Sequence, residues 1–97
     1  MNDDTEVRPG QVWADNDPRV TGRTLRVERL EWSSRQNCTI AVCTIVTNDD
    51  HTQRLLDRPH ESPWRNRYDR RGKTTEIAVR RMRPTSTGYR LISETTT

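Results

Sequence analysis

The sequence is poor in apolar residues and has no long apolar run. Hydrophobic residues make up only 29% of its 97 residues, whereas 32% are charged. No stretch approaches the roughly 20 consecutive apolar residues that a membrane helix needs. The N-terminus MNDDTEVRPG lacks the basic and apolar regions of a signal peptide. We therefore expect a cytoplasmic protein that does not contact membranes and has one small core in a single domain.

Cysteine is scarce, and its spacing argues against a metal site and against a disulfide. Cys38 and Cys43 lie five positions apart in CTIAVC, and residues an odd number apart in a strand point to opposite faces. One strand therefore cannot direct both thiols at one metal ion, nor bring them into disulfide geometry. We expect one thiol in the core and the other on the opposite face, with no metal and no cofactor.

Signatures of catalysis are also missing. The sequence has no glycine-rich phosphate loop, no nucleophile elbow and no metal-ligand spacing. Its two histidines, His51 and His60, lie in a hydrophilic stretch, whereas acid–base catalysis usually needs a histidine or paired carboxylates in a dry cleft. The sequence therefore predicts a protein that is not an enzyme and has no catalytic residues.

The apolar residues that are present gather in short β-branched runs, which predict strands. We expect five strands, at residues 11–14, 23–32, 38–48, 73–79 and 89–93. In the second strand the alternation changes phase between Val27 and Leu30. A helical face would also fit this step, but the flanking residues favour a strand with a β-bulge around Glu28 and Arg29. Trp32 continues the alternation after the bulge.

The expected strands favour a strongly bent sheet that closes into a small all-β barrel. The domain should cover residues 9–93, between flexible tails at residues 1–8 and 94–97. A long basic loop at residues 49–71 separates the third and fourth strands, and a short turn of helix at residues 52–57 is compatible with its sequence.

The segment TEIAVRRMRPTSTGYRLI, residues 75–92, carries three arginines between the last two expected strands. A proline and a glycine mark this connection as a turn. We expect Met82 to point inward and to close the barrel. Arg80, Arg81 and Arg83 would then point to solvent, so the turn explains them without a ligand.

The segments GQVWADNDPR, GRTLRV and TEIAVRRMRPTSTGYRLI resemble those of a set of small, mostly uncharacterised proteins from actinobacteria and their bacteriophages, which are similar in pattern to SH3-like barrels. The resemblance covers residues 10–46 and 73–92 of the chain. It implies a five-stranded SH3-like barrel and an actinobacterial or actinophage origin, so the cytoplasm would be that of the host if a phage encodes the protein. It implies no assigned activity, and residues 49–71 lie outside it.

Basic residues concentrate in the C-terminal part of the chain. Residues 58–97 carry nine arginines and one lysine against four acids, whereas residues 1–57 carry seven arginines against ten acids. A GC-rich genome would also encode sixteen arginines and one lysine, so composition alone does not establish phosphate binding. We expect function in the long loop, because loops beyond ~12 to 15 residues in a compact domain are usually functional or disordered.

Two binding hypotheses share this loop. In the preferred one, aromatic rings stack on unpaired bases of DNA or RNA while cations hold phosphates. In the alternative, the protein is an interaction module that binds another protein, such as the host factor of a phage, through the loop or an exposed barrel edge. The residues expected to bind in either case are Trp64, Arg65, Arg67, Tyr68, Arg70, Arg71 and Lys73. The sequence leaves the identity of the partner and the oligomeric state open.

Overall fold

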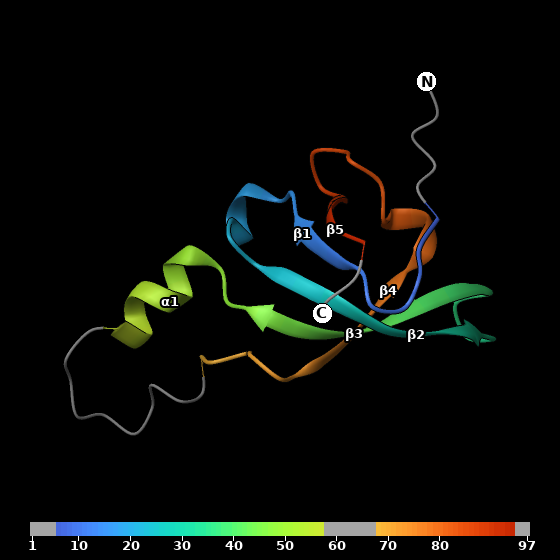
Figure 1. The fold of residues 1–97 in the computed structure, drawn as a ribbon, viewed down its shortest axis with the longest axis horizontal. Helices are drawn as coiled ribbons and strands as arrows, with labels where there is room; N and C mark the ends of the chain where they lie inside the picture. Colours follow the sequence, from blue (N-terminus) through green and yellow to red (C-terminus); the bar gives the residue numbers. More distant parts are fainter. Residues whose placement is uncertain (1–5, 58–67, 95–97) are drawn as a thin grey trace.

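The computed structural model describes residues 6–57 and 68–94. These residues form one antiparallel sheet of five strands, in the order β4-β3-β2-β1-β5 (Figure 1). The strands are β1 (Val12–Asp15), β2 (Thr24–Ser33), β3 (Cys38–Thr47), β4 (Thr74–Ala78) and β5 (Tyr89–Ser93). Helices in the described part of the chain are η1 (Pro18–Val20), α1 (Asp50–Asp57) and η3 (Val79–Arg81). The expected small, five-stranded, SH3-like barrel is thus confirmed, and β1 lies one residue later than the sequence indicated.

A bulge in β2 bends the long hairpin that β2 forms with β3. Two residues of β2, Glu28 and Arg29, lie where β3 supplies only Val42. The extra residue keeps Val27 and Leu30 on the same face of the sheet, although they are three positions apart. The β-bulge that the change of phase predicted is therefore confirmed.

The core lies on the inner face of the sheet and takes side chains from every strand. Trp13 of β1 and Leu25 of β2 are among its most deeply buried members. Burial of a large apolar side chain of this kind contributes roughly 1.5–3 kcal/mol. Cys43 is also fully buried, whereas Cys38 at the start of β3 is half-buried, and both are free thiols. The odd spacing thus places the two thiols apart, as expected.

The connection between β4 and β5 is a turn that closes one end of the barrel. In η3, the backbone N–H of Met82 donates to the carbonyl of Val79 at 2.9 Å. Met82 is 2% exposed, whereas Arg80, Arg81 and Arg83 are exposed, so the prediction for this turn is confirmed. The sequence places Val79 in the preceding strand, but it lies in η3, because the chain leaves the strand to carry Met82 over the core.

The side chain of Gln11 fastens both ends of the described chain to the barrel. It is fully buried and makes four hydrogen bonds. Its Oε1 accepts from Trp13 Nε1 at 3.0 Å and from the backbone N–H of Arg8 at 2.8 Å. Its Nε2 donates to the carbonyl oxygen of Glu6 at 2.9 Å and to Glu94 Oε2 at 3.1 Å. The Nε2 protons and the Oε1 lone pairs of the amide are therefore all used. Because Val7 also lies in the core, packing starts before the domain boundary expected at residue 9.

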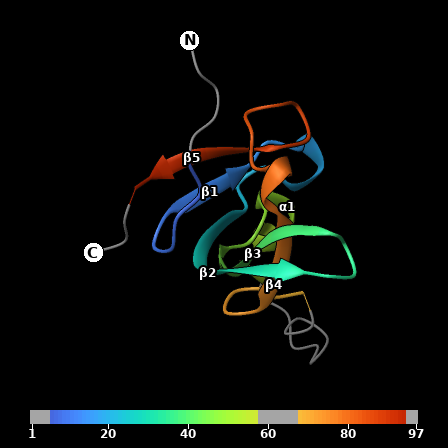
Figure 2. The same cartoon turned by 90° about the vertical axis from the view of Figure 1, so that its right-hand side faces the viewer.

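The far end of the β2–β3 hairpin extends past the core. Leu30 and Trp32 lie on the same face as the core residues but are 40% and 65% exposed. The tip of the hairpin lies apart from β1 and β5 in both views (Figures 1 and 2). The alternation of the sequence therefore identifies the face of these two residues, but nothing in the described part of the chain covers that face completely.

Part of the expected long loop is helical. α1 begins at Asp50, two residues before the position that the sequence suggested, because Asp49 caps it. The carboxylate of Asp49 accepts hydrogen bonds from the backbone N–H of Thr52 at 3.0 Å and from its hydroxyl at 2.7 Å, as an N-cap residue does. Leu56 is buried and anchors the helix. Residues 58–67 lie outside the described residues, and the chain is described again from Tyr68.

Candidate nucleic-acid interface

The return segment, residues 68–73, leads the chain back to the barrel and carries four of the predicted binding residues. Two backbone hydrogen bonds of 2.9 Å join it to Ile45 of β3: Gly72 N–H donates to Ile45 O, and Ile45 N–H donates to Lys73 O. Tyr68 is 54% exposed, and Arg70 and Lys73 are exposed as well. Neither of these two cations forms an ion pair with a described residue. The other predicted residues, Trp64, Arg65 and Arg67, lie outside the described residues.

The fourth predicted residue, Arg71, is neutralised by its neighbour Asp69. Arg71 Nε donates to Asp69 Oδ1 at 3.0 Å, and its terminal nitrogen donates to Asp69 Oδ2 at 2.8 Å. These bonds, together with one from Asn48, hold the pKa of the Asp69 carboxyl well below its usual range. Asp69 is thus bound within the segment, and Arg70 and Lys73 are the cations of the segment that form no ion pair with a described residue.

Asn48 is the side chain that fixes the return segment against α1. It is buried, and its Nδ2 donates to Gln53 Oε1 and to Asp69 Oδ1, both at 3.1 Å. Its Oδ1 accepts from the backbone N–H of Arg70 at 2.8 Å. One amide thus joins the end of β3, the helix and the return segment, so the exposed residues Tyr68 and Arg70 project from a supported backbone.

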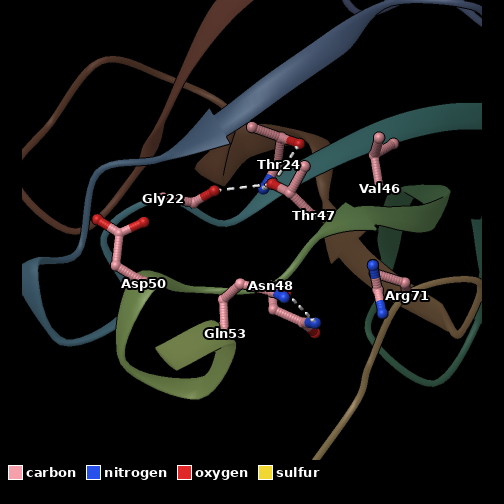
Figure 3. A pocket seen from close by; sticks show the side chains of 8 residues that line it. All are labelled: Gly22, Thr24, Val46, Thr47, Asn48, Asp50, Gln53 and Arg71. Carbon is pink, nitrogen blue, oxygen red and sulfur yellow. Dashed lines mark hydrogen bonds between the residues drawn. The ribbon is translucent and has the colours of Figure 1, made fainter. Parts of the chain in front are cut away.

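A groove of about 520 Å³ lies at the root of the long segment (Figure 3). It is lined by Gly22, Thr24, Val46, Thr47, Asn48, Asp50, Gln53 and Arg71. The hydroxyls of Thr24 and Thr47 lie 2.8 Å apart, and the Thr47 hydroxyl donates to the carbonyl of Gly22 at 2.7 Å. These lining residues include no thiol and no imidazole. The groove can offer hydrogen bonds to a ligand through its hydroxyl, amide and carboxylate groups.

Glycine is required at position 22 beside this groove. Its φ of +98° is a conformation that side chains rarely adopt, and a Cβ there would overlap the carboxylate of Asp50. The backbone N–H of Asp50 donates to the carbonyl of Thr21 at 2.7 Å. This close approach brings the start of α1 against the loop before β2 and forms one wall of the groove.

Arginines in the two halves of the chain are paired differently. Four arginines of the first half each bind an acid two positions away: Arg8 with Glu6, Arg19 with Asp17, Arg26 with Glu28, and Arg29 with Glu31. In a strand this spacing places both side chains on one face. Arg80, Arg81 and Arg90, in contrast, form no ion pair with any described residue. The positive charge of these three arginines is therefore not cancelled by an acid among the described residues.

Other candidate chemistry is limited in the residues that the structure describes. His51 is exposed on α1, and His60 lies outside the described residues. No three His, Cys, Asp or Glu side chains gather as they would around a metal ion in residues 6–57 and 68–94. Within the same ranges, no helix has the length and apolar character needed to span a membrane.

The protein is a small SH3-like barrel, and the return segment gives this barrel an exposed basic surface segment. The chain matches no protein-family model, and no match was found among curated proteins or among solved structures. The resemblance to small actinobacterial and actinophage proteins therefore stays a prediction that rests on the segments quoted above. Sequence reasoning missed Asn48 as a support of the site, although an asparagine directly after an apolar strand was a signal for a turn contact.

Proposed function

We propose that this protein is a small, non-enzymatic nucleic-acid-binding protein that uses the basic, aromatic-containing segment of residues 64–73. The observation that carries the proposal is the arrangement of the return segment, in which Tyr68, Arg70 and Lys73 are exposed. Asp69, the acid between them, is held by Arg71 and Asn48. An exposed ring beside cations that form no ion pair with a described residue suits a ligand with bases and phosphates.

The expected binding free energy comes from two kinds of contact, stacking of bases on aromatic rings and neutralisation of phosphates by cations. Stacking of one base on an aromatic ring contributes roughly 1–3 kcal/mol. Each phosphate that a cation neutralises releases counterions, which steepens the fall of affinity with salt by about 0.7 per contact for a single strand. Affinity that falls steeply with salt is therefore the signature of the proposed function.

The test is a titration of labelled single- and double-stranded DNA and RNA at two salt concentrations, followed by fluorescence anisotropy. A variant with Arg65, Arg67, Arg70 and Arg71 changed to alanine should bind weakly and with a smaller salt slope. Arg8→Ala is a control, because Arg8 is exposed and paired with Glu6 away from the return segment. Unchanged affinity in the four-arginine variant would exclude this segment, and no binding at low salt would exclude nucleic acid.

The alternative function, binding of a protein partner, draws on a different observation. β4 and β5 are the two edges of the sheet, and Ile92 on β5 is exposed. Edge strands can accept a strand from another chain. A pull-down from a nuclease-treated lysate, compared between the natural chain and Ile92→Lys, would test this: enrichment that the substitution abolishes and salt leaves unchanged favours the protein partner.

A further inference from the structure

An exposed tryptophan lies at the end of the barrel away from the return segment. Trp32 lies near the tip of the β2–β3 hairpin, whereas the return segment lies at the other end of the molecule (Figure 1). Most of its ring faces solvent, whereas Trp13 is 1% exposed in the core. The barrel therefore gains little stability from Trp32, and the ring is available for a contact outside the chain.

The strand register places η3 beside this tryptophan. Leu30, Ala41 and Ile77 form one row across β2, β3 and β4. The next row on the same face begins with Trp32 and Thr39, and β4 has ended at that level, so the chain has entered η3. Neighbouring strands lie about 4.8 Å apart, which puts the start of η3 about 10 Å from the backbone of Trp32. Figure 1 shows the orange segment that follows β4 above the far half of the hairpin.

Basic side chains that form no ion pair with a described residue lie on the two elements next to the tryptophan. Arg80 and Arg81 of η3 and Arg35 of the β2–β3 turn are exposed, and none forms an ion pair with a described residue. The acid next to Trp32 in the chain, Glu31, is bound to Arg29 at 2.9 Å. The surroundings of the ring therefore carry positive charge that is free to meet an anionic ligand.

We infer that this end of the barrel binds single-stranded nucleic acid, on a tryptophan surface formed by Trp32, Arg35, Arg80 and Arg81. Trp32 stacks on an unpaired base, and the arginines contact the phosphates on either side of it. The inference rests on the proposed function and deepens it: it adds a second contact on the barrel itself and specifies a single strand as the ligand.

Two features favour a single strand over the other ligands. Bases in a duplex already stack on each other, so a ring at the surface can stack only on a base that is unpaired. A protein interface usually buries ~800 Å² on each partner around a hydrophobic centre. Leu30 is the only other large exposed hydrophobic residue on the described part of the hairpin's inner face, so the apolar area here is small.

The test compares Trp32→Ala with Trp32→Phe, which keeps an aromatic ring. Anisotropy is measured with labelled oligo-dT, oligo-rU and a hairpin duplex. Trp32→Ala should weaken single-strand binding roughly 5- to 150-fold, which corresponds to one lost stacking contact. Trp32→Phe should retain most of the affinity, and duplex binding should not change. The double variant Arg80→Gln/Arg81→Gln should lower the salt slope by about 1.4. Thermal unfolding checks that each variant is folded, which we expect because all three side chains are exposed.

The outcomes separate this inference from the proposed function. If Arg70→Ala/Lys73→Ala weakens binding and Trp32→Ala does not, the tryptophan surface is excluded and the proposed function stands. If the natural chain binds no oligonucleotide at low salt, both are excluded. Equal losses for single strand and duplex would contradict stacking. A nuclease-resistant protein complex that Trp32→Ala disrupts, with unchanged oligonucleotide affinity, would assign the surface to a protein partner and overturn the inference.

Discussion

Replacing Gln11 with leucine should lower the free energy of unfolding by about 2–4 kcal/mol. The two side chains have similar volumes, so the substitution removes hydrogen bonds without opening a large cavity. Its main effect is on Trp13, whose indole N–H is buried and loses the acceptor that lies at 3.0 Å. A buried donor left without a partner costs about 1–3 kcal/mol.

The other contributions to this loss of stability are smaller and partly offset each other. The other three hydrogen bonds of Gln11 are only partly buried, so Arg8, Glu6 and Glu94 can turn to water when these bonds are lost. Each such bond contributes about 0.5–1.5 kcal/mol to stability, and burial of the apolar leucine side chain offsets part of the stability that is lost with these bonds. For a domain of this size, each 1 kcal/mol corresponds to roughly 4–8 °C, so the melting temperature should fall by roughly 10–30 °C.

Urea unfolding followed by far-ultraviolet circular dichroism measures this change. Gln36→Leu is a matched control, because Gln36 lies in the β2–β3 turn and should change stability by less than about 0.5 kcal/mol. Equal midpoints for the two variants would refute the view that Gln11 holds the ends of the chain together.

Gln11→Glu adds a test through pH. The introduced carboxyl would be buried opposite the Glu94 carboxylate, and both burial and like charge raise the pKa of such a group in the folded state. The folded state then prefers the protonated form. The stability of this variant, relative to the natural chain, should be highest below about pH 4.3 and should fall as the pH rises through the raised pKa. A difference that does not depend on pH would contradict the proposed burial.

Three further predictions concern other positions in the fold. Asn48→Ala should cost about 1–3 kcal/mol and speed hydrogen exchange in α1, measured by mass spectrometry, because it removes the three hydrogen bonds that join the end of β3, α1 and the return segment. Burial raises the pKa of the Cys43 thiol to about 11, so iodoacetamide at pH 8 should label Cys38 first, and equal rates would contradict the burial. Gly22→Ala should lower the free energy of unfolding by at least about 1–2 kcal/mol, because alanine is strained at this positive φ. Adding Asp50→Ala should relieve the overlap of the new Cβ with the Asp50 carboxylate but not the backbone strain. Full recovery of stability in this double-mutant cycle would refute the strain.

Local patterns were sufficient to predict the strands, the bulge and the turn before β5. The bulge at Glu28 and Arg29 could be predicted because the alternation changes phase within six residues. The inward orientation of Met82 could be predicted because it depends on a short turn. The exposure of Trp32 could not be predicted in the same way. Alternation identifies a face, whereas coverage of that face depends on whether other elements reach it.

Contacts between distant residues were not predictable from the sequence. Gln11 and Glu94 are 83 positions apart, and Asn48 and Asp69 are 21 positions apart, so no local rule links either pair. In the candidate site, the pairing of Arg71 with Asp69 follows the same two-residue spacing as the ion pairs of the first half and was open to prediction. The prediction for Trp64, Arg65 and Arg67 concerns residues outside the described part of the chain and stays a prediction.

The position of β1 beside β5 has a mechanical consequence. Val12, at the start of β1, pairs with Ser93, at the end of β5, and Gln11 binds Glu94 one step beyond. Both ends of the chain leave the β1–β5 pair at the same end, so tension applied to them would pull along these hydrogen bonds and break them one after another. The barrel should therefore yield to a small pulling force from its ends inward, while the β2–β3 hairpin is still intact.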